Sequence, residues 1–303
     1  MKTCVVVGDS ILDRLRIGRV TRQSPEAPDC PVVKLEEERW ELGGAANVAR
    51  WLAAVEGLKV TYFGQWPLSD RDLIEKTCLD AKVYLNPALC PNSGLLTTKE
   101  RLIVRDGDRP RHLVRVDSDT TMKVSEAEVA EALRRLRGGG SPIDAVVVAD
   151  YDKGVFHGDA GRQLALGLSE VAGERGVPLI VNSKVVDRWR DVPVSCLICN
   201  RNEFASYTGR IPAAAVLIVT QGAGGVDVLS PTALTPTIIN YPSLAERIVD
   251  VTGAGDAFLT GLTYEWLRSG FYLDRLVETG QRWARACCEQ VGVGVPIGGN
   301  LDD

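Results

Sequence analysis

One glycine-rich segment combines residue types that suit phosphoryl transfer. It reads Asp250-Val251-Thr252-Gly253-Ala254-Gly255-Asp256-Ala257-Phe258, and an apolar run that predicts a helix follows it. The small residues 253–255 allow a tight turn, and the amides of a helix start point toward an anion placed there. Asp256, in the first turn, would accept the proton of an attacking hydroxyl. The alternative is that Asp256 only caps the helix, and these residues alone leave both interpretations open.

Two common nucleotide-binding motifs are missing from the sequence. No GxxxxGK[ST] segment occurs, which excludes a P-loop kinase. The first predicted strand, over residues 4–7, leads into Gly8-Asp9-Ser10-Ile11 rather than into GxGxxG. A dinucleotide-dependent enzyme is therefore disfavoured.

The elements that must position this segment fall into two groups. Buried strands alternate with helices in most of the chain, which predicts a mainly parallel sheet covered on both faces. Segments 95–105 and 111–117 instead alternate apolar and charged residues around Asp106-Gly107, as an exposed hairpin does. With the extended segment 14–36, they are expected to form a small separate sheet on one α/β domain spanning residues 1–303. The predicted strands cover 145–149, 178–181, 197–199 and 216–220, and the predicted helices cover 45–56, 124–137, 164–172 and 255–267.

The composition excludes several classes of protein. The 303 residues are 45% apolar and carry a net charge of −5, which gives no general attraction to nucleic acid. The first apolar run has four residues, too short for a signal peptide, and no run approaches a membrane span. We therefore expect a cytoplasmic protein. Cys196 and Cys199 form a CxxC, but residues three apart on a strand point to opposite faces, so buried thiols are expected rather than a zinc or redox site.

Four motifs occur in the order found in the ribokinase-like (PfkB) sugar kinases. They are Gly43-Gly44-Ala45-Ala46-Asn47-Val48-Ala49, Asn200-Arg201-Asn202-Glu203, Val219 through Gly225, and Asp250 through Asp256. The last resembles the D-T-x-G-A-G-D signature of that family. The resemblance implies a ribokinase-like three-layer sandwich, with a mainly parallel central sheet and a small β-sheet lid. It also implies ATP and Mg²⁺ as cofactors and a homodimer formed through the lid.

Further segments resemble the heptose 7-phosphate kinases within that family. Thr97 through Arg101, Leu113 through Asp117 and Ala149 through Gly154 are similar to segments of those enzymes. This resemblance implies phosphorylation of a heptose 7-phosphate at its anomeric hydroxyl. The alternatives are a kinase for another sugar or a nucleoside, and a catalytically silent ligand-binding relative.

The resemblance implies a role for each matching residue. Asp256 would be the base, Gly253, Ala254 and Gly255 would form the anion hole, and Asp13, Gly43, Gly44 and Asn47 would bind the sugar hydroxyls. Lys184, Asn200, Glu203, Thr220, Gly222 and Gly225 would bind the nucleotide, with Asn200 and Glu203 holding Mg²⁺ through water. Arg101, Arg115 and Lys153 would bind a substrate phosphate. The alternatives are turns, helix caps and exposed basic residues.

Two segments depart from the family pattern. Asn182-Ser183-Lys184 stands where heptose kinases have Asp-Pro-Lys, which removes a carboxylate near the phosphates. Gly64-Gln65-Trp66-Pro67 replaces a VGxxGxD run, and the segment from Gln65 to Asn92 is shorter than expected. The nucleotidyltransferase domain fused to some relatives is expected to be absent.

Overall fold

The computed structural model describes residues 1–91, 94–106, 109–140, 142–207, 216–230, 237–245 and 248–289. Within these ranges the main sheet has the strand order β13-β12-β11-β10-β9-β8-β1-β4-β5. The strands pair in parallel from β5 to β11, and β12 and β13 are antiparallel additions. The bounds are β1 Lys2–Gly8, β4 Leu58–Gly64, β5 Tyr84–Asn86, β8 Ala145–Asp150, β9 Leu179–Ser183, β10 Cys196–Asn200, β11 Val216–Thr220, β12 Val226–Ser230 and β13 Thr237–Tyr241.

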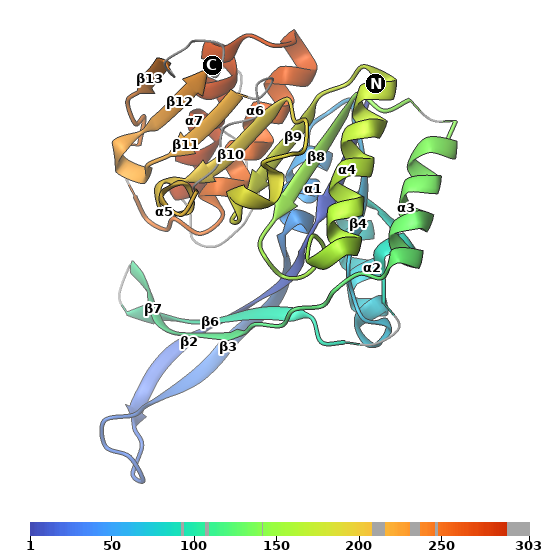
Figure 1. Ribbon diagram of the computed structural model, residues 1–303. Helices are drawn as coiled ribbons and strands as arrows, with labels where there is room; N and C mark the ends of the chain where they lie inside the picture. Colours follow the sequence, from blue (N-terminus) through green and yellow to red (C-terminus); the bar gives the residue numbers. More distant parts are fainter. Residues whose placement is uncertain are drawn as a thin grey trace.

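Helices cover both faces of this sheet, which makes three layers (Figure 1). The central strands are near-continuous runs of valine, isoleucine and leucine, as strands buried on both faces require. One face packs on α1 Ala45–Ala53, α2 Arg71–Asp80, α6 Ala254–Ser269 and α7 Leu273–Cys288. The other face packs on α3 Glu126–Gly138 and α4 Gly158–Arg175, with the short α5 Arg201–Ala205 beside it.

The two cysteines of the CxxC lie on opposite faces of β10. Cys196 belongs to the core under α6 and α7, and Cys199 belongs to the core under α3 and α4. Both thiols are buried and unbridged. Burial raises the pKa of both thiols, that of Cys199 to about 12. The strand geometry predicted from the sequence is therefore confirmed for this pair.

A second, four-stranded sheet projects from the main body as a long, narrow ribbon (Figure 1). It contains β2 Ser10–Gln23, β3 Pro31–Gly44, β6 Thr97–Asp106 and β7 Arg109–Ser118. We call this sheet the lid. Its order is β3-β2-β6-β7, with β2 and β6 parallel and the outer pairs antiparallel. Leu15, Ile17 and Ile103 form a small core of its own.

The lid strands are longer than the sequence predicted. β2 begins at Ser10 and β3 runs to Gly44, because the lid hairpin leaves directly from the end of β1 and returns directly into α1. The predicted turn at Gly107 and Asp108 lies outside the described residues. Helix α4 also begins earlier than expected, at Gly158. The sequence did not predict this start because glycines near it lower the helix propensity. Glycine is present at position 161 for packing, since a Cβ there would lie 2.1 Å from the backbone of Phe156. No helix in the described ranges is long and apolar enough to cross a bilayer.

Candidate active site

A polar cavity of about 250 Å³ lies where the carboxyl ends of the main strands meet the lid and the start of α6. This edge of a parallel sheet is where α/β proteins usually bind ligands. The cavity contains acidic and basic side chains from segments far apart in the sequence. Its lining is Ile11, Asp13, Gly44, Lys99, Arg101, Asp150, Tyr151, Asn182, Lys184, Ile198, Cys199, Asn200, Glu203, Thr220, Thr252, Gly253, Gly255 and Asp256.

A second cavity of about 200 Å³ continues from the first. Thr220 and Gly255 line both, so the two form one cleft. The lining of the second cavity is mostly apolar and includes Ile248, Val251 and Phe258. Gly222 and Gly225 lie there too, in the turn between β11 and β12. The cleft therefore has a charged end and an apolar end, joined at the glycine turn before α6.

Asp256 lines the charged end of this cleft, next to Gly255 at the junction, and its side chain does not cap α6. Gly253 is the N-cap residue, in the left-handed region at φ 81°, and no side chain caps the helix. Asn47 Nδ2 donates to Asp256 Oδ2 at 2.7 Å, and the Tyr151 hydroxyl donates to Oδ1. As a residue, Asp256 is only 7% exposed. The capping interpretation left open by the sequence does not describe this side chain.

The surroundings of Asp256 make it a stronger base than an exposed aspartate. Burial raises the pKa of Asp256 to about 7; the Asn47 amide opposes this rise, Asp13 adds to it, and the positive charges of Arg50 and Lys99 oppose it. A carboxyl with a pKa near neutrality is suited to general base catalysis, because it accepts a proton readily and is still substantially ionised at pH 7.

The glycine turn places small residues against the cleft. Gly253 and Gly255 line the polar cavity, whereas the Ala254 amide donates to Val251 O at 3.2 Å within the turn. The C-terminal end of α7 anchors the same segment, because Val249 N and Asp250 N both donate to Cys288 O. A rigid turn at a helix start is a suitable site for an anion.

The candidate sugar-binding residues gather beside Asp256. Asp13 is buried and forms an ion pair with Arg101, which is also buried. A Cβ at Gly43 would lie 2.1 Å from Asp13 Oδ2, so glycine is required for this approach. Gly44 has φ 59° and lines the cavity, and Asn47 reaches Asp256 as described.

Of the three candidate residues for a substrate phosphate, one lines the cavity and two do not. Arg101 lines the cavity, but its guanidinium bonds to Asp13. Arg115 has a side chain 56% exposed that pairs with Asp117, and Lys153 pairs with Asp119 at 2.7 Å. Neither Arg115 nor Lys153 is among the described residues that line either cavity.

Two lysines face the polar cavity, and one of them lies on the lid. Lys184 Nζ lies 5.6 Å from the centre of the Tyr151 ring. Lys99, on lid strand β6, lines the same space. Burial and then the positive charge of Lys184 lower the pKa of Lys99. Its position within the Thr97-Thr98-Lys99-Glu100-Arg101 segment was the available sequence signal.

Asn200 and Glu203 form the reciprocal cap of α5. Asn200 Oδ1 accepts from the amides of Asn202 and Glu203, and Glu203 Oε2 accepts from Asn200 N at 2.6 Å. Both residues also line the polar cavity, and burial raises the pKa of Glu203. No cluster of three His, Cys, Asp or Glu within the described ranges could hold a metal directly. This donor set fits Mg²⁺ held largely through water, as that ion commonly is.

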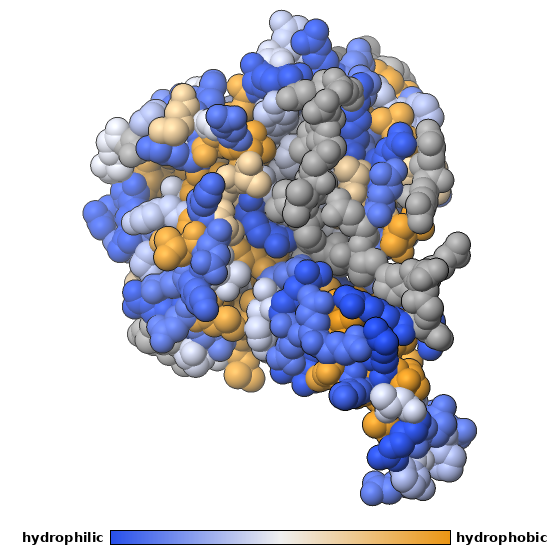
Figure 2. Space-filling view, turned by 180° about the vertical axis from the view of Figure 1, so that it is seen from behind, coloured by the Kyte–Doolittle hydropathy of each residue, from blue (hydrophilic) through white to orange (hydrophobic). Residues whose placement is uncertain are grey.

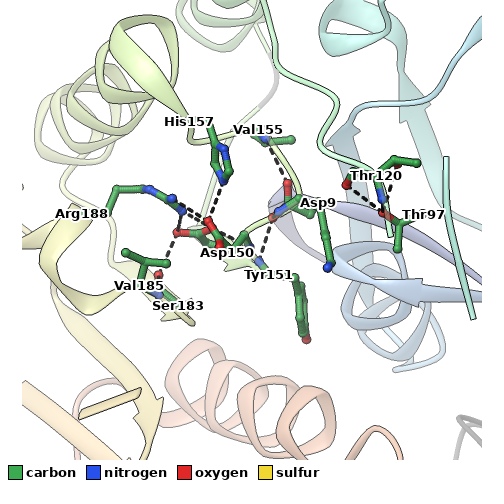
Figure 3. Close-up of polar contacts among 12 residues, drawn as sticks. Asp9, Thr97, Thr120, Asp150, Tyr151, Val155, His157, Ser183, Val185 and Arg188 are labelled. Atoms are coloured by element: carbon green, nitrogen blue, oxygen red, sulfur yellow. Dashed lines mark hydrogen bonds and ion pairs between the residues drawn. The ribbon is translucent and has the colours of Figure 1, made fainter. Parts of the chain in front are cut away.

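A buried carboxylate, Asp9, fixes the loop after β8. It accepts from the amides of Tyr151, Lys153 and Val155 at 2.7 to 3.1 Å, and from Gln65 Nε2 (Figure 3). Burial, and then the negative charge of Asp150, raises the pKa of Asp9, and these hydrogen bonds oppose the rise. The role of Gln65 explains one departure from the family pattern, since its amide helps to hold this loop.

The other departure, at Asn182 and Ser183, lies beside a buried ion pair. Asp150 accepts from Arg188 at 2.6 Å and from Ser183 Oγ at 2.8 Å (Figure 3). Asn182 lines the cavity, as do Asp150 and Lys184. Ser183 therefore has a structural partner that a proline at this position would lack.

Comparison with known proteins identifies the family. Residues 194–298 match the model described as pfkB family carbohydrate kinase. The bifunctional protein HldE of Caulobacter vibrioides is 32% identical over 273 residues, which are 84% of this chain and 53% of that protein. The chain belongs to the pfkB family of carbohydrate kinases. HldE of Escherichia coli is 30% identical over 84% of the chain, and the chain spans about half the length of these curated relatives.

Solved structures of other kinases share the fold. Phosphofructokinase-2 from Escherichia coli superposes with a TM-score of 0.69 at 16% identity, covering 95% of this chain and 92% of that one. A carbohydrate kinase from Agrobacterium tumefaciens gives 0.68 at 19% identity, covering 100% and 96%. At these identities the likeness concerns the fold alone. The predicted ribokinase-like α/β fold with a mainly parallel sheet and a smaller second sheet is confirmed.

Proposed function

We propose that this chain transfers the γ-phosphoryl group of ATP to a hydroxyl of a sugar phosphate, with a heptose 7-phosphate as the acceptor at its anomeric hydroxyl. The observation that carries the proposal is the position of Asp256. Asp256 is a buried residue that lines the charged cavity, next to Gly255, which lines both the charged and the apolar cavity. The HldE relatives support a heptose phosphate as the acceptor.

The two ends of the cleft suit the two substrates. The apolar end, near Ile248, Val251 and Phe258, would take the nucleotide base. The phosphates would then pass Thr220 and Gly255 toward Lys184. The amides near Gly253 and Gly255 would stabilise the charge of the phosphoryl group during transfer.

The acceptor would lie on the lid side of Asp256. Asn47 donates to Asp256, and the Asp13 carboxylate lines the same cavity and adds to the pKa rise of Asp256; both side chains can bond sugar hydroxyls. Asp256 would take the proton from the attacking hydroxyl while the oxygen forms its bond to phosphorus. Mg²⁺, when bound through water near Asn200 and Glu203, would neutralise phosphate charge.

One observation favours a second candidate, a kinase for an unphosphorylated sugar or a nucleoside. Arg101 is already paired with Asp13, and Arg115 and Lys153 pair with acidic neighbours outside the cavity. On the lid side of the described cavity, the positive charge without such a pairing in these contacts is then that of Lys99. Asn182, in place of a carboxylate, is the feature that would favour a silent relative.

The lid is proposed as the contact of a homodimer. Val114 and Val116 are 47% and 53% exposed on β7, and Leu35 on β3 is 43% exposed. Figure 2 shows hydrophobic side chains between the charged ones on the projecting sheet. A sheet of four strands also leaves β3 and β7 as edges. Light scattering on the parent and on Val116→Asp would test this contact, and a monomeric parent would exclude it.

A substrate panel tests the catalytic proposal. ATP and Mg²⁺ are supplied with heptose 7-phosphates, other sugar phosphates, free sugars and nucleosides, and ADP release is measured. The highest kcat/KM on a heptose 7-phosphate supports the first candidate. A preference for an unphosphorylated acceptor supports the second, and no turnover on any acceptor overturns both.

A further inference from the structure

We propose that Tyr151 is a positioning residue for Asp256, and that its hydroxyl holds the base in the orientation needed for proton transfer. This inference rests on the proposed function of the site. Tyr151 lies in the loop after β8, and its hydroxyl donates to Asp256 Oδ1. It also lines the polar cavity.

The carboxylate is held from two sides. Asn47 on α1 donates to Oδ2 at 2.7 Å, while Tyr151 donates to Oδ1. Two donors on different oxygens fix the plane of the carboxylate, which otherwise rotates freely about its last torsion. An ionised carboxylate has about four lone-pair positions, so acceptor positions remain for a sugar hydroxyl. The direction of approach of that hydroxyl is thereby restricted.

The backbone of Tyr151 is also held in place by hydrogen bonds. Its amide donates to Asp9 Oδ2 at 2.7 Å, and Asp9 also binds the amides of Lys153 and Val155. Asp9 is buried, and Figure 3 shows its carboxylate directed at this loop, with the Tyr151 ring extending away from Asp9. The hydroxyl is therefore positioned before any ligand arrives, which reduces the ordering required during the reaction.

The ring also connects the base to the phosphate-binding end of the site. Lys184 Nζ lies 5.6 Å from the ring centre, within the range of a cation–π contact. Tyr151 thus contacts the proposed base through its hydroxyl and the proposed phosphate-binding lysine through its ring. A purely structural alternative is that the ring only packs against the core, which it also touches.

The test compares Tyr151→Phe with Tyr272→Phe, a control at a tyrosine 60% exposed on the surface. Loss of a hydrogen bond to a charged group is expected to lower kcat by about 10- to 100-fold, with KM for ATP changed less than about threefold. The acidic limb of the kcat/KM profile should move to higher pH by about one unit, because a donor that favours the carboxylate has been removed. The control should match the parent.

A second variant separates the hydroxyl from the ring. If the hydroxyl positions Asp256, the acidic limb of the kcat/KM profile moves to higher pH in both Tyr151→Phe and Tyr151→Met. If only the packing of the ring matters, the profile of Tyr151→Phe matches that of the parent, which overturns the proposal. Loss of cooperative melting in Tyr151→Phe also overturns it, because the hydroxyl would then be structural.

A measurement without turnover keeps this inference separate from the proposed function. The Asp256 carboxyl is followed by ¹³C NMR in aspartate-labelled protein and assigned with Asp256→Asn. In Tyr151→Phe its titration should move to higher pH, even if the parent phosphorylates none of the sugars tried. Coincident titration curves in parent and variant overturn the positioning role, whereas absent turnover overturns only the kinase proposal.

Discussion

Asn47 Nδ2 lies 2.7 Å from Asp256 Oδ2, although 209 positions separate the two residues in the sequence. The amide of Asn47 is itself oriented, because Arg50 Nη2 donates to its Oδ1 at 2.7 Å. The first and last family motifs therefore meet in a single hydrogen bond. Proposals about the base can accordingly be tested from either motif.

Asp256→Asn should lower kcat by about 10²- to 10⁴-fold, because the amide cannot accept a proton from the acceptor hydroxyl. Binding of ATP and sugar should stay within several-fold, since the size of the side chain is kept. The measurement is steady-state turnover with calorimetric binding on the same folded variant. The control is Asp159→Asn, an aspartate in the first turn of α4. Turnover within about tenfold of the parent would remove Asp256 from the catalytic role.

The activity should depend on pH through Asp256, whose pKa is raised to about 7 by burial. Only the carboxylate can act as a base, so kcat/KM should rise about tenfold per unit below pH 7 and level off above it. The effect of this raised pKa on the stability of the folded state has the opposite pH dependence to the effect on activity. A raised carboxyl pKa favours the folded state below the ordinary value of 3.8, and this contribution is lost as the pH rises through about 7. A flat kcat/KM between pH 5.5 and 8, in roughly constant ionic strength, would contradict the assignment of the base.

Arg101→Met should destabilise the fold, because it leaves the buried Asp13 without its partner. Breaking a buried ion pair from one side typically costs about 3–5 kcal/mol. Arg115→Met on the neighbouring strand should change stability by less than about 0.5 kcal/mol, since its side chain is 56% exposed. Urea unfolding of both variants checks the difference. Equal midpoints for the two variants would show that the Asp13–Arg101 pair does not stabilise the fold.

Lys99→Met should raise KM for an anionic substrate, because Lys99 and Lys184 face the same polar cavity. One lost charge-assisted contact corresponds to about 10- to 150-fold. Comparing KM for ATP with KM for the sugar phosphate shows which anion Lys99 binds. Lys34→Met, at an exposed position of the lid, is the matched control. If both variants keep parental KM values for both substrates, Lys99 has no role in binding.

Asn182→Asp should lower the Mg²⁺ concentration for half-maximal activity by several-fold, because it restores a carboxylate beside Lys184 in the cavity lining. Melting temperature should change little, since the side chain faces the cavity. Titration of Mg²⁺ at fixed ATP gives the result. An unchanged or higher Mg²⁺ requirement would mean that the position does not contribute to metal handling.

Much of the site was predictable because the motifs encode local backbone geometry. The turn at Gly253 and the cap at Asn200 depend on residues adjacent in sequence, and the structure shows both. Contacts between distant segments were not predictable. The Tyr151 hydroxyl reaches Asp256 from a loop whose backbone is held by Asp9, 142 positions earlier in the sequence. The pairing of Arg101 with Asp13 likewise depends on the parallel alignment of β6 with β2, which the separate strands do not reveal.

The alternation of strand residues predicted the lid as a separate sheet but not its length. Alternation fades near Gly8 and Gly44, where both faces become buried, so the strand ends resembled loops. The length of α4, which begins at Gly158, was also predicted too short. Glycine lowers local helix propensity, and the packing of Gly161 against Phe156 becomes visible only in three dimensions.

Because β2 and β3 are long, a small rotation of the lid where it joins the main body displaces its far end by a large distance. Each strand has 14 residues, and both leave the main body at one place, between Gly8 and the start of α1. At about 3.3 Å per residue, the arm is about 45 Å long, so a rotation of about 5° at its base displaces its far end by about 4 Å. Asp13 lies three residues from the start of β2, or about 10 Å along the arm, and moves by about 0.9 Å in the same rotation. The same rotation therefore moves the far end of the ribbon widely, while the Asp13 carboxylate, which we propose to bind the sugar, moves little relative to Asp256.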